Sequence, residues 1–333
     1  MKIRSILLSI ALLLPAAATS TMAQGGQAQP SPDEQKMAEA IISATDLVMK
    51  LRAADEFIKK YPMSSLRSRI ANALVDQVSN VTDTTQKVAL AQSYETIFTN
   101  PAEENLLMPV LIDALTQAKR SAEAFTRGGE FLTRNPDYLP VLVQLLALGT
   151  AEAKTKNPKF VTQSLQYGAH AIQLAETDKK PVWVDDAAWN KYKSETLPGL
   201  YQSMGLLNLV KGDSTQARGS YAKASELAPT DPFNFVMLAG IINEEYQTSA
   251  KKYQGLPAGP AKDEELKKAQ ALMDAAIDAY AHAVAVAEGN ATLQAVRQQY
   301  LQDMEAYYKY RHNNSTAGMQ ELINKYKVTP NRP

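Results

Sequence analysis

The amino-acid sequence predicts an all-α protein, a right-handed α-solenoid of helical hairpins with a C-terminal capping helix. Alternating β-branched runs are few, and residues that favour helices fill segments whose apolar positions recur every three to four residues. One set of large and small residues returns 34 positions further along, where Tyr201, Met204 and Gly205 are followed by Phe235, Leu238 and Ala239. Because the apolar face of one helical hairpin can be buried only against another hairpin, such a recurrence predicts a stack of repeats.

The segment from 201 to 229 resembles a tetratricopeptide repeat, whose pattern is large, apolar, small and large, then small, aromatic and small residues before a proline. The residues that match are Tyr201, Met204, Gly205, Asn208, Ala217, Tyr221, Ala224 and Pro229. From Lys179 to the C-terminus, about half of the chain, the sequence is similar to a group of exported bacterial tetratricopeptide proteins. The resemblance implies a helical scaffold that binds other proteins, and it supplies no catalytic residue.

The N-terminus predicts export. Lys2 and Arg4 precede an apolar stretch over 6–14, and Thr21-Met22-Ala23 ends the segment with a typical cleavage site. We therefore expect a signal peptide over 1–23, cleavage after Ala23, and a disordered leader over 24–32, which is rich in Gly, Gln and Pro. The apolar stretch is too short for the roughly 20 residues of a bilayer span.

Composition narrows the classes of partner. The chain has no cysteine, which excludes both disulfides and the acyl anchor of a lipoprotein. Lys and Arg number 35, as do Asp and Glu, and loss of the signal peptide would leave a charge near −2. This balance favours no general attraction to nucleic acid or to an anionic membrane. A protein released into the periplasm or secreted from the cell is expected.

The N-terminal half, 33–176, predicts divergent helical hairpins. The expected helices are one that starts near Asp33, then 46–60, 65–77, 84–98, a pair within 102–133, 138–153 and 160–176. Prolines at 62, 101 and 136 are expected to separate them.

Residues 177–290 predict two clearer repeats. Asp185 or Asp186 is expected to cap a long helix that extends to about Lys193. In the second repeat, Ala276, Tyr280 and Ala283 lie 59 residues after Ala217, Tyr221 and Ala224 instead of 34. The extra residues, near 246–266, include four Gly and Pro residues, so we expect a dispensable surface loop flanked by helix extensions.

The C-terminal region, 291–327, predicts two capping helices, 291–310 and 319–326, followed by a tail over 328–333. Tyr300 and Tyr307 are expected to cover the last repeat while Tyr308 and Tyr310 face water. The alternative is that Tyr307, Tyr308 and Tyr310 stack on a glycan or another extended ligand.

No catalytic, metal or cofactor site is predicted. His170, His282 and His312 are not spaced as helical zinc ligands are, and no nucleophile or nucleotide-binding motif occurs. Acidic clusters at 185–186, 244–245 and 263–265 are expected to be helix caps or solvated faces. A glycan-cleaving helical enzyme would need paired carboxylates, and none can be named.

The predicted function is therefore a non-catalytic scaffold that binds a peptide or protein segment. The expected concave lining is mostly apolar, and Trp183 is a further candidate contact; the lining residues are Gln202, Leu206, Leu209, Phe233, Val236 and Gly240. The alternative for Leu206 and Leu209 is that the next helix covers them. A narrower hypothesis is an accessory role in cell-envelope or polysaccharide assembly and export.

Overall fold

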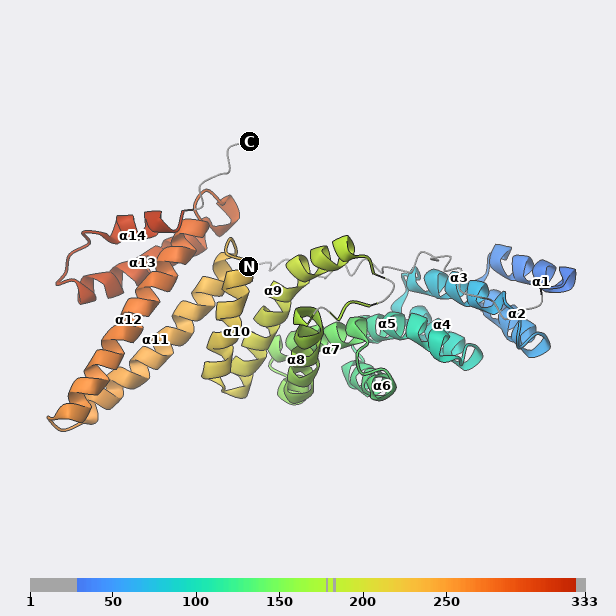
Figure 1. Cartoon of the computed structure of the whole chain (residues 1–333), viewed down its shortest axis with the longest axis horizontal. Coiled ribbons are helices and arrows are strands. Elements are labelled where there is room, and N and C mark those ends of the chain that lie inside the picture. The colour runs from blue at the N-terminus through green and yellow to red at the C-terminus, as the bar shows by residue number, and fades with distance from the viewer. Residues whose placement is uncertain (1–28, 178, 182–183, 328–333) are drawn as a thin grey trace. The chain divides into compact units, whose positions relative to one another are not determined.

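The computed structural model describes residues 29–177, 179–181 and 184–327. The predicted signal peptide (1–23), residues 24–28 of the predicted leader, Trp183 and the predicted tail (328–333) lie outside these residues. The chain divides into two compact units, Met1–Val184 and Asp185–Pro333. Throughout the described residues the regular elements are α-helices and two short 3₁₀ helices, so the predicted all-α class is confirmed (Figure 1).

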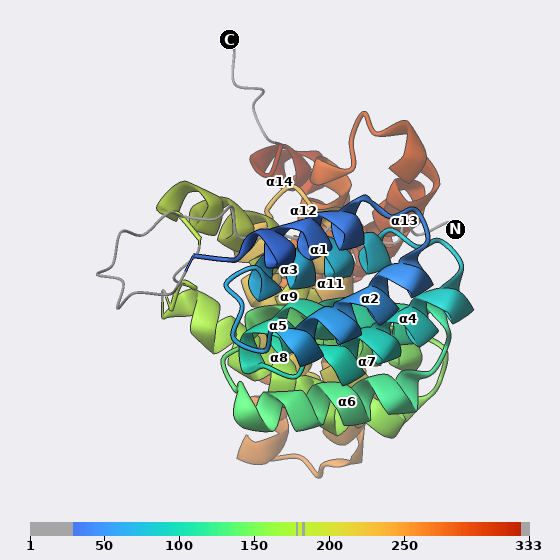
Figure 2. The ribbon, with the colours of Figure 1, turned by 90° about the vertical axis from the view of Figure 1, so that its right-hand side faces the viewer.

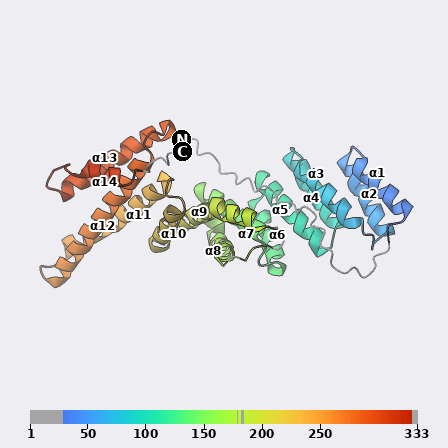
Figure 3. The same ribbon diagram turned by 45° about the horizontal axis from the view of Figure 1, so that its top comes forward.

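The first unit is a series of hairpins made of consecutive helices. In chain order they are α1 (Pro32–Ser43), α2 (Leu47–Lys60), α3 (Arg67–Ser79), α4 (Thr84–Ile97), α5 (Pro101–Gln117), α6 (Ser121–Arg134), α7 (Leu139–Lys154), η1 (Pro158–Phe160) and α8 (Val161–Glu176). Helix α1 contacts α3, α3 contacts α5, and α5 contacts α7, so each hairpin packs on the next (Figures 2 and 3). Stacking of this kind is the α-solenoid arrangement that the sequence predicts.

Aspartate side chains cap the starts of several helices, and capping by Asp185 is as the sequence predicts. Asp46, Asp83 and Asp185 each accept a hydrogen bond of 2.7 Å from the backbone N–H three residues further on. Such a bond satisfies one of the N–H groups that a helix start leaves unpaired. The first helix differs, because Ser31 caps it in a reciprocal pair with Glu34, and α1 therefore begins at Pro32, within the predicted leader.

Pro109 lies inside α5 without ending it. A proline has no N–H to donate to the carbonyl four residues earlier, which here belongs to Asn105. The hydroxyl of Tyr138 donates to that carbonyl at 2.6 Å, and the Gln144 amide donates to the carbonyl of Pro109 at 2.9 Å. Side chains from the neighbouring hairpin thus compensate for the proline, so α5 continues for 17 residues.

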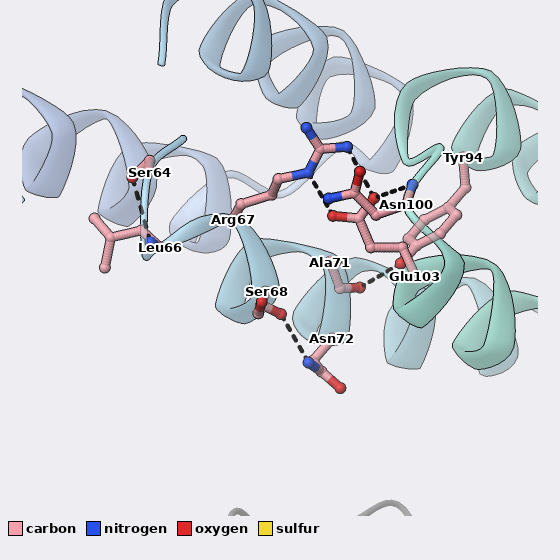
Figure 4. A network of polar contacts seen from close by, with 9 residues as sticks. All are labelled: Ser64, Leu66, Arg67, Ser68, Ala71, Asn72, Tyr94, Asn100 and Glu103. Carbon is pink, nitrogen blue, oxygen red and sulfur yellow. Dashed lines mark hydrogen bonds and ion pairs between the residues drawn. The ribbon is translucent and has the colours of Figure 1, made fainter. Parts of the chain in front are cut away.

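A buried ion pair joins two hairpins of the first unit. Arg67 at the start of α3 donates two hydrogen bonds to Glu103 in the first turn of α5, at 2.5 and 2.9 Å (Figure 4). Glu103 also accepts from the backbone N–H of Asn100 at 3.0 Å. The two side chains are 12% and 5% exposed. This fork fixes α3 against α5, and the Tyr94 hydroxyl adds a bond to the carbonyl of Ala71 at 3.2 Å.

The second unit contains longer helices. They are α9 (Asp186–Lys211), α10 (Ser214–Leu227), α11 (Pro232–Gly255), α12 (Pro260–Val286), η2 (Ala291–Leu293), α13 (Gln294–Arg311) and α14 (Met319–Lys325). The sequence predicts that the helix starting at Asp185 or Asp186 ends near Lys193, but it continues through Pro198 to Lys211. A proline usually ends or bends a helix, but Pro198 does not end α9. Leu197 and Leu200, on either side of it, are buried, and this packing holds the chain in the helix.

The tetratricopeptide spacing locates the tight contacts of the second unit correctly. Ala217, Tyr221 and Ala224 on α10 are all fully buried. A Cβ on Gly205 of α9 would lie only 2.6 Å from ring atom Cε2 of Tyr221. The absence of a side chain at 205 therefore leaves room for the tyrosine ring, which is the contact expected of a small and an aromatic residue in this pattern.

The later members of the pattern differ in burial. Ala276, Tyr280 and Ala283 on α12 are buried, as is Phe235 on α11. Leu238 is partly buried against them. The closing proline of the first repeat, Pro229, is exposed in the turn between α10 and α11. Met204 and Tyr201 are partly buried on α9.

The extra residues near 246–266 are mostly helical: the predicted helix extensions are present, but the predicted loop is reduced to a short turn. Helices α11 and α12 continue side by side through this region, and only residues 256–259 form the turn (Figures 1 and 3). Buried Ser249 donates to buried Glu265 at 2.6 Å, and Lys252 forms an ion pair with the same carboxylate. These contacts hold the extended parts of α11 and α12 together. The insertion therefore lengthens the α11–α12 hairpin and does not form a separate loop.

The C-terminal helices cap the second unit as predicted. Met304 and Tyr308 of α13 and Ile323 of α14 are buried in a cluster with α12. Tyr300 and Tyr307 pack partly buried against the same cluster, which agrees with the covering role expected for them. Tyr308 was expected to face water, but its ring is buried and its hydroxyl donates to the carbonyl of Ala317 at 2.8 Å.

Candidate functional site

The three histidines form structural contacts. His170 bonds to Asp137 at 2.7 Å, His312 stacks on Tyr308, and His282 lies between the rings of Phe235 and Tyr326, where burial lowers its pKa. Over the residues that the structure describes, no three His, Asp or Glu side chains are grouped to hold a metal ion.

The acidic clusters also serve the fold. Asp185 caps α9, and Asp263 lies in the first turn of α12. Glu244 and Glu245 were expected at a helix end but lie inside α11, where Glu245 pairs with Arg218 of α10 at 2.7 Å. Glu265, also expected to be solvated, is buried, and its pKa is lowered by hydrogen bonds from Lys252 and Ser249.

The predicted lining residues of the second unit lie on α9 and α11. We call Gln202, Leu206, Phe233, Val236 and Gly240 the α9–α11 surface. Phe233 is 45% exposed, Leu206 and Val236 are partly exposed, and Gly240 is exposed with no atom within 4 Å of a Cβ built on it. Apolar side chains and a bare stretch of helix backbone are thus accessible along α11.

Hydrogen bonds hold this surface in place. Asp231 caps α11 by accepting the backbone N–H of Phe233 at 3.0 Å, and its other carboxylate oxygen accepts from Gln202 at 2.7 Å. Gln202 also donates to buried Asn234 at 2.9 Å. Both N–H groups of Gln202 are therefore used between α9 and α11, so this residue fixes the position of Phe233 and has only its carbonyl oxygen left for a ligand.

Leu209 contributes to packing. It lies partly buried against the cluster of Ala217, Tyr221 and Ile241. The ring of Tyr221 also meets Phe233 edge-on, with ring centroids 6.2 Å apart. Phe233 thus packs on a residue of the repeat core. Leu209 agrees with the alternative prediction, in which a neighbouring helix covers it. Trp183, the remaining candidate contact, lies outside the described residues.

The tyrosines of α13 have separate roles. The hydroxyl of Tyr307 donates to Asn243 of α11, its ring meets that of Tyr246 edge-on, and Tyr308 is buried. Tyr310 alone of the predicted cluster is strongly exposed, at 75%. The three rings therefore do not present one flat platform for a sugar.

The first unit contains a groove that the sequence did not reveal. It lies between α2 and α4 and has a volume of about 600 Å³. Its lining residues are Val48, Leu51, Arg52, Asp55 and Lys59 on α2, and Gln86, Ala89, Leu90, Ser93, Thr96 and Ile97 on α4. We call this feature the α2–α4 groove. No sequence signal points to it, because the apolar residues that line it, such as Val48 and Leu51, follow the ordinary pattern of an amphipathic helix.

In the described part of the chain, no helix is both long and apolar enough to cross a bilayer.

Comparison with known proteins gives a likeness among solved structures. No protein-family model matches the chain. No curated protein matches it either. Among solved structures, the chain is similar to a tetratricopeptide repeat protein from Parabacteroides merdae, with 11% sequence identity and a TM-score of 0.38; the alignment covers 88% of this chain and 96% of that chain.

Proposed function

We propose that the protein is an exported, non-catalytic scaffold that binds a segment of another protein on its α9–α11 surface. One observation carries the proposal: Phe233 stays 45% exposed although a hydrogen-bonded framework fixes its position. An accessible aromatic side chain that is already ordered loses little entropy on binding, which is what an anchor for a partner requires. The neighbouring Val236 and Gly240 extend the apolar surface along one face of α11.

The ligand that fits this surface is a segment with apolar anchors. The residues that define the surface carry no charge, so recognition of a terminal carboxylate by Lys or Arg is disfavoured there. Repeated helical hairpins that expose one face commonly bind peptides or protein segments in this way. An accessory role in envelope assembly is the narrower form of the same proposal.

Capture of a partner tests the site. The full mature chain and its Phe233→Asp/Val236→Asp variant should be compared as baits in an extract of the source organism's cell envelope, with captured proteins identified by mass spectrometry. We expect the variant to lose the proteins captured by the wild type, because a partner that binds there would have to remove water from two unpaired carboxylates, which is energetically unfavourable. Both baits should show the same helical circular dichroism.

Leu227→Asp is the matched control, since Leu227 is also 45% exposed but lies at the end of α10. It should capture the same proteins as the wild type. If the double variant does so as well, the binding site is elsewhere.

Export is a separate proposal, and it rests on residues 1–23 of the sequence. Expressed with its N-terminus intact in a bacterial host with a periplasm, the chain should be recovered from the periplasm or medium with Gln24 as its first residue. Intact-mass analysis decides between this product and a chain that retains residues 1–23. The retained form would contradict export by a cleaved signal peptide.

A further inference from the structure

The α2–α4 groove is continuous along both of its helices. Its α2 residues are spaced at three to four positions from Val48 to Lys59, and its α4 residues do the same from Gln86 to Ile97. Each set therefore follows one face of its helix for 11 residues, about 16 Å at the rise of an α-helix. That length matches three turns of a helix laid alongside.

The polar bridges found between helices at the next position of the stack are missing at the groove. Between α4 and α6, Gln92 donates to Glu123 and Glu95 pairs with Arg127. Between α2 and α4, by contrast, the described residues contain no hydrogen bond or ion pair that crosses the gap. The side chains of α4 that line the groove are all neutral.

The floor of the groove is apolar, and its walls mix apolar and polar side chains. Leu51 and Leu90 are buried beneath it, and Val48 on its wall is 50% exposed. The hydroxyls of Ser93 and Thr96 donate to carbonyls of their own helix, at 2.9 and 2.8 Å. An extended peptide would find few partners here for its backbone N–H and C=O groups. A helix satisfies its backbone internally, so it fits this lining better.

The charged residues along the α2 side of the groove indicate which charge a bound helix should carry. Asp55 is paired with Lys59 at 2.6 Å, whereas Arg52 is exposed on the lining and forms no ion pair within the described residues. The α4 side of the groove adds no charge. The unneutralised charge of the rim is therefore positive.

We propose that the α2–α4 groove binds an amphipathic helix of a partner protein, with apolar residues at three-to-four-residue spacing facing Leu51 and Leu90 and a carboxylate facing Arg52. This site uses no residue of the α9–α11 surface, so it stands or falls independently of the function proposed above.

The test uses two fluorescein-labelled, helix-stapled peptides of 14 residues. Both present leucines at positions 2, 5, 9 and 12, and they differ only in carrying Glu or Lys beside the leucine stripe. Fluorescence anisotropy with the full mature chain should show saturable binding, tighter for the Glu peptide by a factor on the order of five, the size of one partly exposed ion pair.

Three variants make the result specific. Arg52→Glu should reverse the preference, so that the Lys peptide binds more tightly. Ala89→Trp should weaken both peptides at least tenfold by filling the groove. Arg69→Glu changes another exposed arginine, on α3, that does not line the groove, and it should leave both affinities unchanged. Absence of saturable binding, or a preference that Arg52→Glu leaves unaltered in a chain with wild-type circular dichroism, overturns the proposal.

Discussion

Replacing Tyr221 by alanine should lower the free energy of unfolding of the second unit by about 3–5 kcal/mol, the range found for buried aromatic residues truncated to alanine. The ring is fully buried between Gly205 of α9 and the packed face of α11. Removing it leaves a cavity that the rigid helices cannot close. Urea denaturation followed by circular dichroism measures the change.

Two further substitutions separate the ring from its hydroxyl. The Tyr221 hydroxyl is buried and has no hydrogen-bond partner among the described residues, and burial raises its pKa. Tyr221→Phe should therefore leave stability unchanged or raise it slightly, because it removes a polar group that is desolvated without compensation. Tyr310→Ala, at a strongly exposed tyrosine, should change stability by less than about 0.5 kcal/mol. Equal losses in Tyr221→Ala and Tyr310→Ala would mean that the repeat register is wrong.

Glu103→Gln should cost the first unit about 3–5 kcal/mol, the range for breaking a buried ion pair from one side. The substitution leaves the partly buried Arg67 guanidinium without a counter-charge and removes the buried carboxylate that accepts from Asn100. The adjacent residue supplies the control, since Glu104 also forms a forked pair, with Arg134, but that arginine is 61% exposed. Glu104→Gln should cost less than about 1 kcal/mol.

Urea denaturation of the two glutamine variants measures whether the loss of stability depends on the burial of the ion pair or only on its presence. If Glu103→Gln is as mild as Glu104→Gln, the Arg67–Glu103 pair does not hold α3 to α5.

The sequence predicts the helices of this protein well because caps and apolar periodicity are local signals. The tetratricopeptide spacing also identifies buried Ala217, Tyr221 and Ala224, since small and aromatic residues at fixed intervals reflect helix contacts within one repeat. Local signals mislead where packing overrides them. Pro198 and Pro109 do not break their helices, since neighbouring side chains hold the chain in place.

The Gly and Pro residues near 255–260 mark a real turn, but they say nothing about its length. Residues 248–255 stay helical because α11 has a partner in α12, with Ser249 and Glu265 bonded between them. The α2–α4 groove could not be predicted for a related reason. Its floor residues, Leu51 and Leu90, have the pattern of any buried helix face, and a groove depends on the spacing of two helices that no single segment encodes.

The candidate site was predicted in part. Phe233 and Val236 were expected on an accessible helix face, and the structure exposes them there. The role of Gln202 could not be foreseen, because its bonds to Asp231 and Asn234 join residues about 30 positions apart and depend on the packing of α9 against the start of α11.

Site-specific photo-crosslinking from position 240 is the most direct measurement of whether the α9–α11 surface binds a protein segment. Gly240 is exposed on α11, and a side chain there would enter open space. A benzoylphenylalanine placed at 240 in living cells of the source organism should therefore fold normally and form a covalent adduct with one protein, mapped to a single segment with apolar anchors. The same probe at 227 should give no such adduct. A folded protein that forms no adduct from 240, or forms the same one from 227, would contradict a binding surface on α9 and α11.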